Sequence, residues 1–515
     1  MMVGTGGWGY SHKVVAALAA MFALAFLAAG CGGGDDSSSY SFDGSGYPNG
    51  DLANTRNSEG PIKASTVGEL ELAWTVPLNA ESAFGAYASS PILSKGVVYS
   101  QDLESNVQAI DAGNGEVLWT KKYDSPDHGP NGVVVQDGMV FGATATAAFA
   151  LDQKSGKQLW SKTLTRNEVE GIDMAPGYDD GIVYVSTVPV NVSEFYGPGG
   201  VGILWALDAK TGKKLWSFDT VPKDLWGKPD VNSGGGLWYP PAFDGKGSMY
   251  FGVGNPGPFP GTDDEPWGSS RPGPNLYTDS LVKLNAKTGK LQWYHQVTPH
   301  ALYDWDFQNP PILVNSGGRE LVLGAGKSGI VLALDANSGK PVWERKVGKH
   351  NGHDDDGLLA MRGESSKLKT PMLVYPGSLG GVIAPMATDG KTVYVPVING
   401  PLEIVTQTER QEPGPLNGEL VALDLKNGEL KWKREFPTAP PFGFTTVSND
   451  LVFTTTYDGK VHAFDTGSGQ PAWQESLPAG TNAGVAIAGD MVVVGAGLAA
   501  AEGQTPQLVA YRLGG

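Results

Sequence analysis

The chain has 515 residues but only one cysteine, Cys31, and fewer basic than acidic side chains. A single cysteine excludes an intramolecular disulfide, and the chain lacks the C-x-x-C-H motif that attaches a c-type haem. The 37 Lys and Arg against 54 Asp and Glu give a formal net charge of -17. Nucleic acids and anionic membranes attract clustered Lys and Arg, so this balance argues against both as partners.

Long apolar runs are also scarce. The run 14–29 follows His12 and Lys13, and it is too short for a membrane span but typical of a signal-peptide core. It ends in LAAGC (27–31), which resembles a bacterial lipobox. We therefore expect a signal peptide over 1–30, a lipid on Cys31 and an extracytoplasmic, membrane-anchored protein. A plain signal peptide with an incidental cysteine is the alternative.

The residues that follow the cysteine are rich in Gly, Ser and Asp. Such a composition buries too little apolar surface to offset the entropy of ordering, so we expect a flexible tether over 31–50. The rest of the chain, 51–515, is expected to fold. Its many turn formers, among 73 Gly and 36 Pro in the whole chain, make long helices improbable.

An eleven-residue pattern, A-x-D-x-x-x-G-x-x-x-W, is the dominant feature of that folded part. Each copy predicts a strand, a tight Asp/Gly turn and a second strand. Further apolar runs precede several copies, which gives four short strands per repeat, the content of a β-propeller blade. The copies are AIDAGNGEVLW (109–119), ALDQKSGKQLW (150–160), ALDAKTGKKLW (206–216), KLNAKTGKLQW (283–293), ALDANSGKPVW (333–343), ALDLKNGELKW (422–432) and AFDTGSGQPAW (463–473).

Two incomplete copies lie at the ends of the folded part. The segment QLVAYRL (507–513) has no Gly or Trp after it, and LELAWTVPL (70–78) has a Trp but no preceding Ala-x-Asp. The two halves complement each other, so we predict that they pair. The sequence thus predicts an all-β fold, an eight-bladed β-propeller whose ring is closed by N- and C-terminal strands, which leaves no free sheet edge.

The repeat resembles the Trp-docking motif of the pyrroloquinoline quinone-dependent (quinoprotein) alcohol dehydrogenase-like β-propeller family. This resemblance implies a girdle of Trp side chains, each stacked on the Gly turn of the neighbouring blade. The girdle residues would be Trp74, Trp119, Trp160, Trp216, Trp293, Trp343, Trp432 and Trp473. Outer-membrane assembly scaffolds share the same repeat without any cofactor, so the motif predicts the fold more strongly than the activity.

Function is expected where the repeat is interrupted, because insertions between blade strands collect on one face. Five tryptophans outside the girdle and the signal peptide all lie within one stretch, 205–305, that spans two of these interruptions. We interpret this concentration of aromatic surface as a site for a flat aromatic ligand. These residues are Trp205, Trp226, Trp238, Trp267 and Trp305.

Three local segments in this region resemble the quinone and calcium site of the family. GGGLW (234–238) implies that Trp238 forms the floor under the quinone. GVGNPGPF (252–259) implies that Asn255 is a calcium ligand, and VSEFYGPGG (192–200) implies the same for Glu194. Oxygen ligands of this kind suit calcium, a hard cation. The alternatives are a core tryptophan and an ordinary Asn-Pro turn.

The segment TPHALYDWDFQNPPIL (298–313) resembles the part of the family that contains the catalytic aspartate. The resemblance implies that Asp306 is the general base and a calcium ligand, although the spacing leaves Asp304 as a competitor. GAGKSG (324–329) places Lys327 where the family has a basic residue near the reactive carbonyl of the quinone. Lys327 is therefore a candidate both for cofactor binding and for catalysis; a solvated turn lysine is the alternative.

Two segments depart from the family pattern, and a third has the composition of a metal site. DHGPNGVVVQDG (127–138) has neither the Cys pair nor the Arg expected beside the quinone, and LGGVIAPMATDG (379–390) lacks an Asn-Trp pair. KHNGHDDDG (349–357) contains two His and three Asp, but its spacing matches no zinc pattern. We interpret the last segment as a solvated acidic loop.

Together these features predict a dehydrogenase that uses pyrroloquinoline quinone and calcium to oxidise an alcohol or polyol outside the cytoplasm. Since the chain has no haem motif, electrons would pass to a separate acceptor such as a cytochrome c. The alternative is a cofactor-free propeller lipoprotein that acts as a binding or outer-membrane assembly scaffold.

Overall fold

Antiparallel β-sheets make up nearly all of the regular structure in the computed structural model, which describes residues 44–191, 193, 195–499 and 502–514. The all-β prediction is confirmed. Cys31, the expected signal peptide and most of the expected tether lie outside the described residues. Within the described ranges, no helix is long and apolar enough to cross a membrane.

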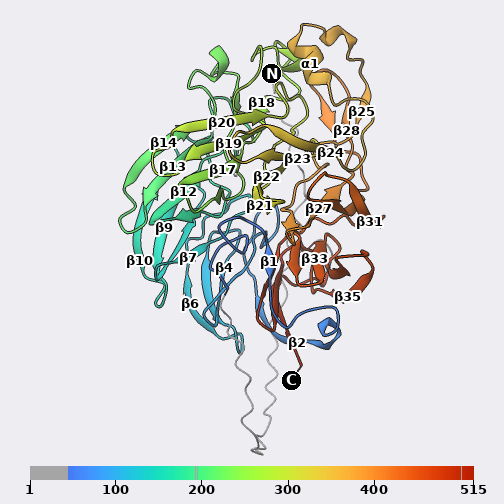
Figure 1. Cartoon of the computed structure of the whole chain (residues 1–515). Coiled ribbons are helices and arrows are strands. Elements are labelled where there is room, and N and C mark those ends of the chain that lie inside the picture. Colours follow the sequence, from blue (N-terminus) through green and yellow to red (C-terminus); the bar gives the residue numbers. More distant parts are fainter. Residues whose placement is uncertain (1–43, 192, 194, 500–501, 515) are drawn as a thin grey trace, which may run out of the picture. The chain divides into compact units, whose positions relative to one another are not determined.

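Eight sheets of four or five strands follow one another along the described chain, as the colours of Figure 1 show. In seven of them the strands follow in chain order from one edge to the other. The first four sheets are β3 (Ile92–Ser94), β4 (Val97–Gln101), β5 (Val107–Asp111) and β6 (Val117–Lys121); β7 (Val134–Gln136), β8 (Met139–Ala143), β9 (Ala147–Asp152) and β10 (Gln158–Thr163); β11 (Gly177–Asp179), β12 (Ile182–Ser186), β13 (Ile203–Asp208) and β14 (Lys214–Asp219); and β16 (Ala242–Phe243), β17 (Ser248–Gly252), β19 (Ser280–Asn285) and β20 (Leu291–Gln296).

The last four sheets repeat this arrangement, and the final one combines strands from both ends of the described chain. They are β21 (Ile312–Ser316), β22 (Arg319–Ala325), β23 (Ile330–Asp335) and β24 (Pro341–Lys346); β26 (Ala387–Thr388), β27 (Thr392–Ile398), β30 (Gly418–Asp424) and β31 (Leu430–Phe436); β32 (Thr446–Ser448), β33 (Leu451–Thr456), β34 (Lys460–Asp465) and β35 (Pro471–Ser476), joined by β1 (Asn57–Ser58); and β36 (Val485–Ala488), β37 (Met491–Ala496) and β38 (Gln507–Leu513), joined by β2 (Leu70–Pro77).

Strand β2 carries Trp74 and pairs antiparallel with β38, so the two incomplete repeats share one sheet. Figure 1 shows β2, in blue, beside the red C-terminal strands. The first strands of neighbouring sheets also contact one another, in the series β36–β3–β7–β11 and again in β16–β21 and β26–β32–β36.

Seven of the eight predicted girdle tryptophans each fasten one sheet to the next through a glycine, whereas Trp473 meets the rings of Phe453 and Tyr511 instead. The indole Nε1 of Trp160 donates to the carbonyl of Ala209 at 2.8 Å. Its ring covers Gly212, where φ is 66° and an added Cβ would lie 2.7 Å from the indole. Glycine is therefore required both by its backbone conformation and by the close contact. The same pairing recurs as Trp74 with Gly115, Trp119 with Gly156, Trp216 with Gly289, Trp293 with Gly339, Trp343 with Gly428 and Trp432 with Gly469.

The insertions contain the remaining elements, which are all short. They are the two-stranded sheet β15 (Ser233–Gly234) and β18 (Pro256–Gly257), the three-stranded sheet β25 (Met372–Val374), β28 (Leu402–Ile404) and β29 (Arg410–Gln411), the helix α1 (Asp356–Met361) and the 3-10 turns Val67–Glu69, Leu225–Gly227, Pro266–Gly268 and Ser365–Lys367.

The segment before β1 runs along the first strands of five sheets. Its backbone carbonyls accept hydrogen bonds of 2.7 to 3.0 Å from strands β7, β16, β21, β26 and β32. Residues 44–50, which we assigned to the tether, belong to this segment, and Gly46 and Asn49 contact neighbouring loops and strands. The accepting carbonyls are those of Gly46, Leu52, Ala53, Thr55 and Arg56.

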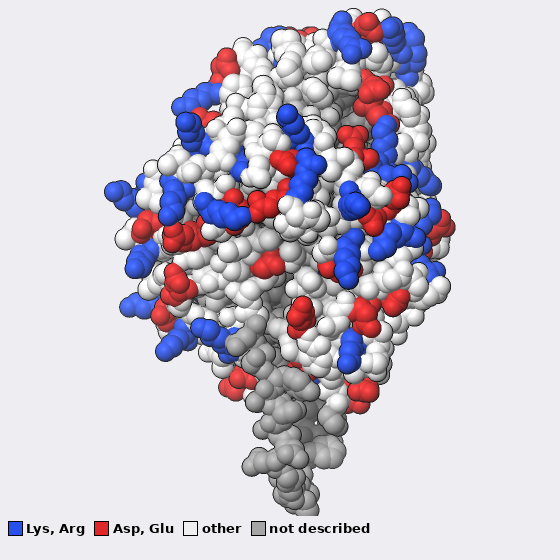
Figure 2. All heavy atoms as spheres, viewed as in Figure 1, with Lys and Arg blue, Asp and Glu red and all other residues white. Residues whose placement is uncertain are grey.

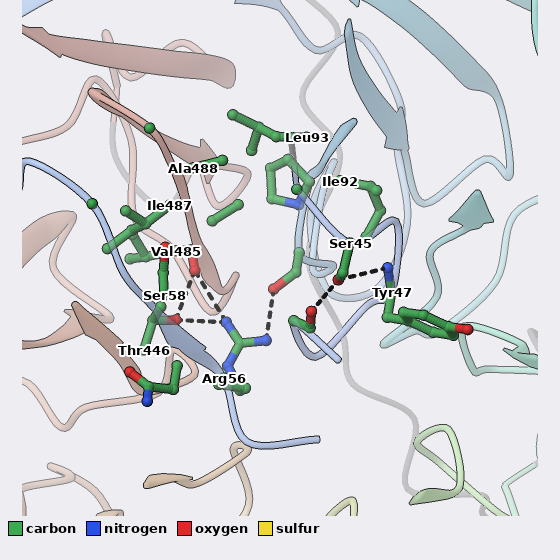
Figure 3. A pocket seen from close by; sticks show the side chains of 18 of the residues that line it. Ser45, Tyr47, Arg56, Ser58, Ile92, Leu93, Thr446, Val485, Ile487 and Ala488 are labelled. Carbon is green, nitrogen blue, oxygen red and sulfur yellow. Dashed lines mark hydrogen bonds between the residues drawn. The ribbon is translucent and has the colours of Figure 1, made fainter. Parts of the chain in front are cut away.

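Arg56 is the charged centre of this segment. Its guanidinium is fully buried and donates to the carbonyl of Thr445 at 2.6 Å and to the hydroxyls of Thr446 and Ser90 at 2.7 and 3.2 Å. Burial lowers the pKa of Arg56 to about 9. A cavity of about 460 Å³ opens beside it, between the N-terminal segment and the β36–β37 turn (Figure 3).

Candidate active site

Asp306 is the point at which four separate segments meet. It lies in the connection between β20 and β21, and its side chain is 1 % exposed. Its Oδ1 accepts hydrogen bonds from the backbone N–H of Asn255 at 3.0 Å and from the indole Nε1 of Trp238 at 3.2 Å. Its Oδ2 lies 2.7 Å from the Nζ of Lys327. Because a buried carboxylate needs such partners, these contacts hold Asp306 in one position.

Tyr196 adds a third donor to the same oxygen. Its hydroxyl lies 2.9 Å from Asp306 Oδ1 and also within hydrogen-bond distance of Asn255 Oδ1. Burial, together with the negative charges of Asp306 and Asp304, raises the pKa of Tyr196 well above its ordinary value. The phenol is therefore a neutral donor between the carboxylate and the amide.

Lys327 pairs with two carboxylates, because its Nζ also lies 3.0 Å from Asp304 Oδ2. Burial alone would lower the pKa of Lys327, but the two aspartates outweigh it and raise that pKa above its usual value. Burial and the charge of Asp306 raise the pKa of Asp304 to about 7, against the opposing charge of Lys327. Asp304 Oδ1 is buried and has no hydrogen-bond partner.

A third buried carboxylate, Asp279, interacts electrostatically with Asp306, Asp304 and Lys327. Both of its side-chain oxygens are without a hydrogen-bond partner, and burial and the charge of Asp306 raise its pKa well above its ordinary value. The fully buried Arg271 acts on it electrostatically but donates its hydrogen bonds to Asn275 and to the carbonyls of Pro258 and Ala301. Three carboxylates thus face two cations.

Trp238 lies in a buried aromatic cluster beside these charges. Its neighbours in that cluster include Tyr196, Tyr239, Phe259 and Phe444. The rings of Tyr196 and Phe259 meet edge to face, with centroids 5.1 Å apart. At Gly254 an added Cβ would lie 2.8 Å from Asp306 Oδ1 and 3.2 Å from Trp238 Nε1, so glycine lets the backbone approach both.

A family model described as the β-propeller domain of glucose, ethanol and alcohol dehydrogenases matches residues 171–355, the part that contains the whole cluster. A quinohemoprotein alcohol dehydrogenase of Comamonas testosteroni is 28 % identical over 84 % of this chain and 68 % of its own length. The quinohemoprotein alcohol dehydrogenase ADH IIB of Pseudomonas putida is 28 % identical over 81 % and 67 %.

The chain is thus similar to the pyrroloquinoline quinone-dependent alcohol dehydrogenase-like β-propeller family over the part that contains the cluster.

Solved structures agree with this family in their fold. The quinohemoprotein alcohol dehydrogenase of Comamonas testosteroni superposes with a TM-score of 0.77, at 24 % identity over 91 % of this chain and 80 % of that chain. A europium-containing methanol dehydrogenase follows with 0.73, at 20 % identity over 91 % and 98 %. A second family model, the outer membrane protein assembly factor BamB, matches residues 103–233 and 416–512.

The structure brings together most of the residues that the family resemblance implied. Trp238, Asn255, Asp306 and Lys327 converge, and the competitor Asp304 shares Lys327 with Asp306. Glu194 lies outside the described residues.

Sequence reasoning missed two residues of this site. Tyr196 lies two positions after Glu194, in the segment 192–200 that the sequence analysis singled out, but nothing in the sequence distinguishes a buried tyrosine ring there from an exposed one. Asp279 precedes β19 and carries no motif.

The five non-girdle tryptophans do not form one aromatic surface, so that expectation was wrong. Only Trp238 contacts the carboxylates. Trp305 packs with Trp267 and Tyr303 and donates to the carbonyl of Pro376 at 3.0 Å. Trp205 and Trp226 pack in a third cluster. Tryptophan therefore serves packing in the inserted loops as well as in the girdle.

The acidic loop 349–357 is more structured than we expected. His350 pairs with Asp354 and His353 with Asp356, each at 2.7 Å. Asp356 is buried and accepts a hydrogen bond from Tyr303, the residue before Asp304. The loop thus supports the backbone of the site.

The side chains present fit a hard cation and a flat cofactor only in part. Asp304 Oδ1 and both side-chain oxygens of Asp279 lack partners, and the carboxylates outnumber the cations, which together favour a bound cation. Within the described residues, however, no group of three or more His, Cys, Asp or Glu is placed to hold a metal. Trp238 and Tyr196 supply the aromatic surface for a planar ring.

Proposed function

We propose that this protein is a quinoprotein dehydrogenase that oxidises an alcohol or a polyol. The observation that carries the proposal is the convergence of Trp238, Asn255, Tyr196 and Lys327 on the single carboxylate of Asp306. The two relatives reported above are both named quinohemoprotein alcohol dehydrogenases, which supports the same substrate class.

The cofactors in this proposal are pyrroloquinoline quinone and calcium. When bound, the quinone supplies the oxidising power and calcium polarises it. Trp238 would lie against the quinone, and Asn255, Asp306 and Glu194 would hold the calcium. Lys327 would supply positive charge next to the ring.

The proton of the alcohol needs a base among the chain's own residues. Asp306 was the sequence prediction, and it remains a candidate. The contacts favour a division of roles, however, because Asp306 accepts three hydrogen bonds on Oδ1 and pairs through Oδ2 with Lys327 at 2.7 Å, whereas Asp304 Oδ1 has neither kind of partner. A pKa of about 7 also suits a general base better than that of an ordinary carboxylate.

The finer architecture and the location belong to the same proposal. We take the eight sheets as eight blades of a closed ring; the β2–β38 pairing and the seven Trp–Gly contacts support it. The protein would be lipid-anchored through Cys31 outside the cytoplasm, with a separate electron acceptor such as a cytochrome c. Acidic and basic side chains are interspersed on the face shown in Figure 2, which offers no basic patch to a nucleic acid.

Reconstitution tests this function. The purified full chain is incubated with pyrroloquinoline quinone and calcium, and dye reduction is followed across a panel of alcohols and polyols. We expect turnover of at least one substrate, and none without the quinone. Failure to take up quinone in the presence of calcium would contradict the proposal.

The second candidate is a cofactor-free assembly scaffold. The match of residues 103–233 and 416–512 to the BamB model favours it. That match leaves out Asp306, Lys327 and Asn255, for which a scaffold offers no use. An absence of quinone binding, together with retention of a partner protein on the intact chain, would favour the scaffold.

A further inference from the structure

The three-stranded sheet β25–β28–β29, which lies outside the eight repeated sheets, packs beside the candidate active site. It is formed by the insertions that follow β24 and β27. Ile404 of β28 is buried in one hydrophobic cluster with Tyr303 and Trp305, the residues on either side of Asp304. Arg410, the first residue of β29, is the ladder partner of Ile404. The packing of β28 thus brings Arg410 to the neighbourhood of Asp304.

The guanidinium of Arg410 is held at the outer end of a stack of aromatic rings. Its Cζ lies 4.5 Å from the ring centroid of Phe259, and its Nη1 donates to the carbonyl of Phe259. The ring of Phe259 meets that of Tyr196, whose hydroxyl donates to Asp306 at 2.9 Å. Phe259 and Tyr196 are buried, whereas Arg410 is exposed. The stack therefore leads from solvent to the carboxylate of Asp306.

A second contact joins the same two loops. Thr408, in the loop between β28 and β29, donates from Oγ1 to Asp263 Oδ1 at 3.0 Å. Asp263 and Phe259 both belong to the loop after β18. The two loops are therefore connected at two points, only one of which involves the charge of Arg410.

The charge of Arg410 acts on the carboxyl groups of the site. Burial raises the pKa of Asp304, and the charges of Lys327 and Arg410 both act against that rise. Desolvation raises the pKa of Glu412, and the same two charges again act against it. Arg410 and Lys327 thus influence the same carboxyl groups, although one cation is exposed and the other buried.

Most hydrogen-bond donors of Arg410 are unused. A guanidinium presents its N–H groups in a planar fork that matches the two oxygens of a carboxylate. In the described part of the chain, one hydrogen bond and no ion pair involve this guanidinium. Stacking on Phe259 fixes the plane of the fork, so little conformational entropy is lost when an anion binds.

We propose that Arg410 determines the substrate class of this enzyme by binding a carboxylate at the far end of the alcohol. This inference rests on the proposed function, because it names the substrate of the same site. The substrate is a hydroxy carboxylate, with its hydroxyl at Asp304 and Asp306 and its carboxylate held by two parallel hydrogen bonds from Arg410. The oxidation of the hydroxyl is that of the proposed function, and the carboxylate is unchanged by it.

A purely structural role for Arg410 is the alternative, since its contacts with Phe259 also hold the loop after β18. Such a role would affect all substrates alike. A carboxylate-binding role affects only substrates that carry the charge, and it weakens as added salt screens an exposed ion pair.

Paired substrates distinguish these roles on the full chain reconstituted with quinone and calcium. The carboxylates are γ-hydroxybutyrate, δ-hydroxyvalerate and ε-hydroxycaproate, and each is compared with the neutral primary amide of the same length. For the preferred length, the wild type should have a KM about tenfold lower for the carboxylate than for the amide. Arg410→Gln should abolish this ratio, and Arg410→Lys should restore part of it, because lysine keeps the charge without the fork.

The ratio of the two KM values isolates binding, because any effect through Asp304 changes kcat for both members of a pair. Thr408→Val is the matched control, since it removes the other contact between the loops and no charge. It should change both KM values by the same factor. Glu412→Gln should lower the KM of the carboxylate by about two- to threefold, since it removes a neighbouring negative charge. Equal KM ratios in the wild type and Arg410→Gln would overturn the proposal.

Equilibrium binding separates this inference from the proposed function. Calorimetry with ε-hydroxycaproate, on the full chain with quinone and calcium added, should give a Kd about tenfold higher for Arg410→Gln than for the wild type. That difference, without turnover of any alcohol, would support the carboxylate site and contradict the dehydrogenase. Turnover of neutral alcohols together with equal Kd values would overturn the role of Arg410 alone.

Discussion

The two buried carboxylate clusters of this molecule solve the same electrostatic problem in different ways. At the active site, Lys327 is an internal counterion that Asp304 and Asp306 share at 3.0 and 2.7 Å. At Asp127 and Asp173, no lysine or arginine in the described part of the chain plays that part. A built-in counterion keeps a site charged whatever the solution contains, whereas a cluster without one must take up a proton or an ion.

The largest difference between the clusters should appear in turnover. With quinone and calcium present, Asp304→Asn and Asp306→Asn should each lower kcat by about 10²–10⁴-fold, because one removes the proposed base and the other its supporting carboxylate. Quinone titration separates them, since Asp306→Asn should also weaken cofactor binding while Asp304→Asn should not. If Asp304→Asn retains full activity, the base is Asp306, as the sequence predicted.

Removal of Lys327 should turn the active-site cluster into one without an internal counterion, like that of Asp127 and Asp173. Lys327→Met leaves two buried carboxylates unpaired, which should lower the free energy of unfolding by about 3–5 kcal/mol. Urea unfolding at pH 8 measures this, with the exposed Lys213→Met as the control. Adding Asp304→Asn to Lys327→Met should restore part of the loss. An unchanged midpoint for Lys327→Met would mean that the ion pair contributes nothing net.

The free energy of unfolding, measured in EDTA over a series of pH values, tests the titration of Asp173 in the second cluster. Burial raises the pKa of Asp173 to about 7, so between its unfolded value and pH 7 the folded state binds more protons than the unfolded state. The contribution of Asp173 to the free energy of unfolding therefore falls as pH rises through this interval, by at most about 1.4 kcal/mol per pH unit, and is flat above it.

Asp173→Asn provides the reference for that series, because it removes the titration and leaves other groups in place. The wild type should lose stability relative to this variant between about pH 4 and 7. Parallel curves for the two proteins would mean that Asp173 does not titrate in this range.

The smallest effect should come from Tyr196→Phe. It removes a donor shared by Asp306 and Asn255, and a loss of about 1–2 kcal/mol corresponds to roughly a tenfold drop in kcat/KM. Steady-state kinetics measure it, and Tyr294→Phe, at a partly exposed ring, is the control. A drop larger than a hundredfold would give the phenol a direct part in the chemistry.

The parts of the molecule differ in how far sequence could predict them. The Trp and Gly positions were predictable because the docking contact repeats seven times and each copy requires the same two residues. Asn255, Asp306 and Lys327 were recognisable by family resemblance alone. Tyr196, Asp279 and the Asp127–Asp173 cluster were not, because each depends on loops from separate sheets coming together, and no local pattern encodes that contact. The role of Trp205 as packing was hidden for the same reason.

The pairing of β2 with β38 has a consequence for how the protein reaches this state. More than four hundred residues separate Leu70 from Leu513, yet they are partners in one ladder. That ladder cannot form until β38 is available, so the sheet that joins both ends depends on the contact of highest sequence separation and should form slowly. Until then the edges of β2 and of the growing last sheet stay open, and chaperones have their longest opportunity to bind them.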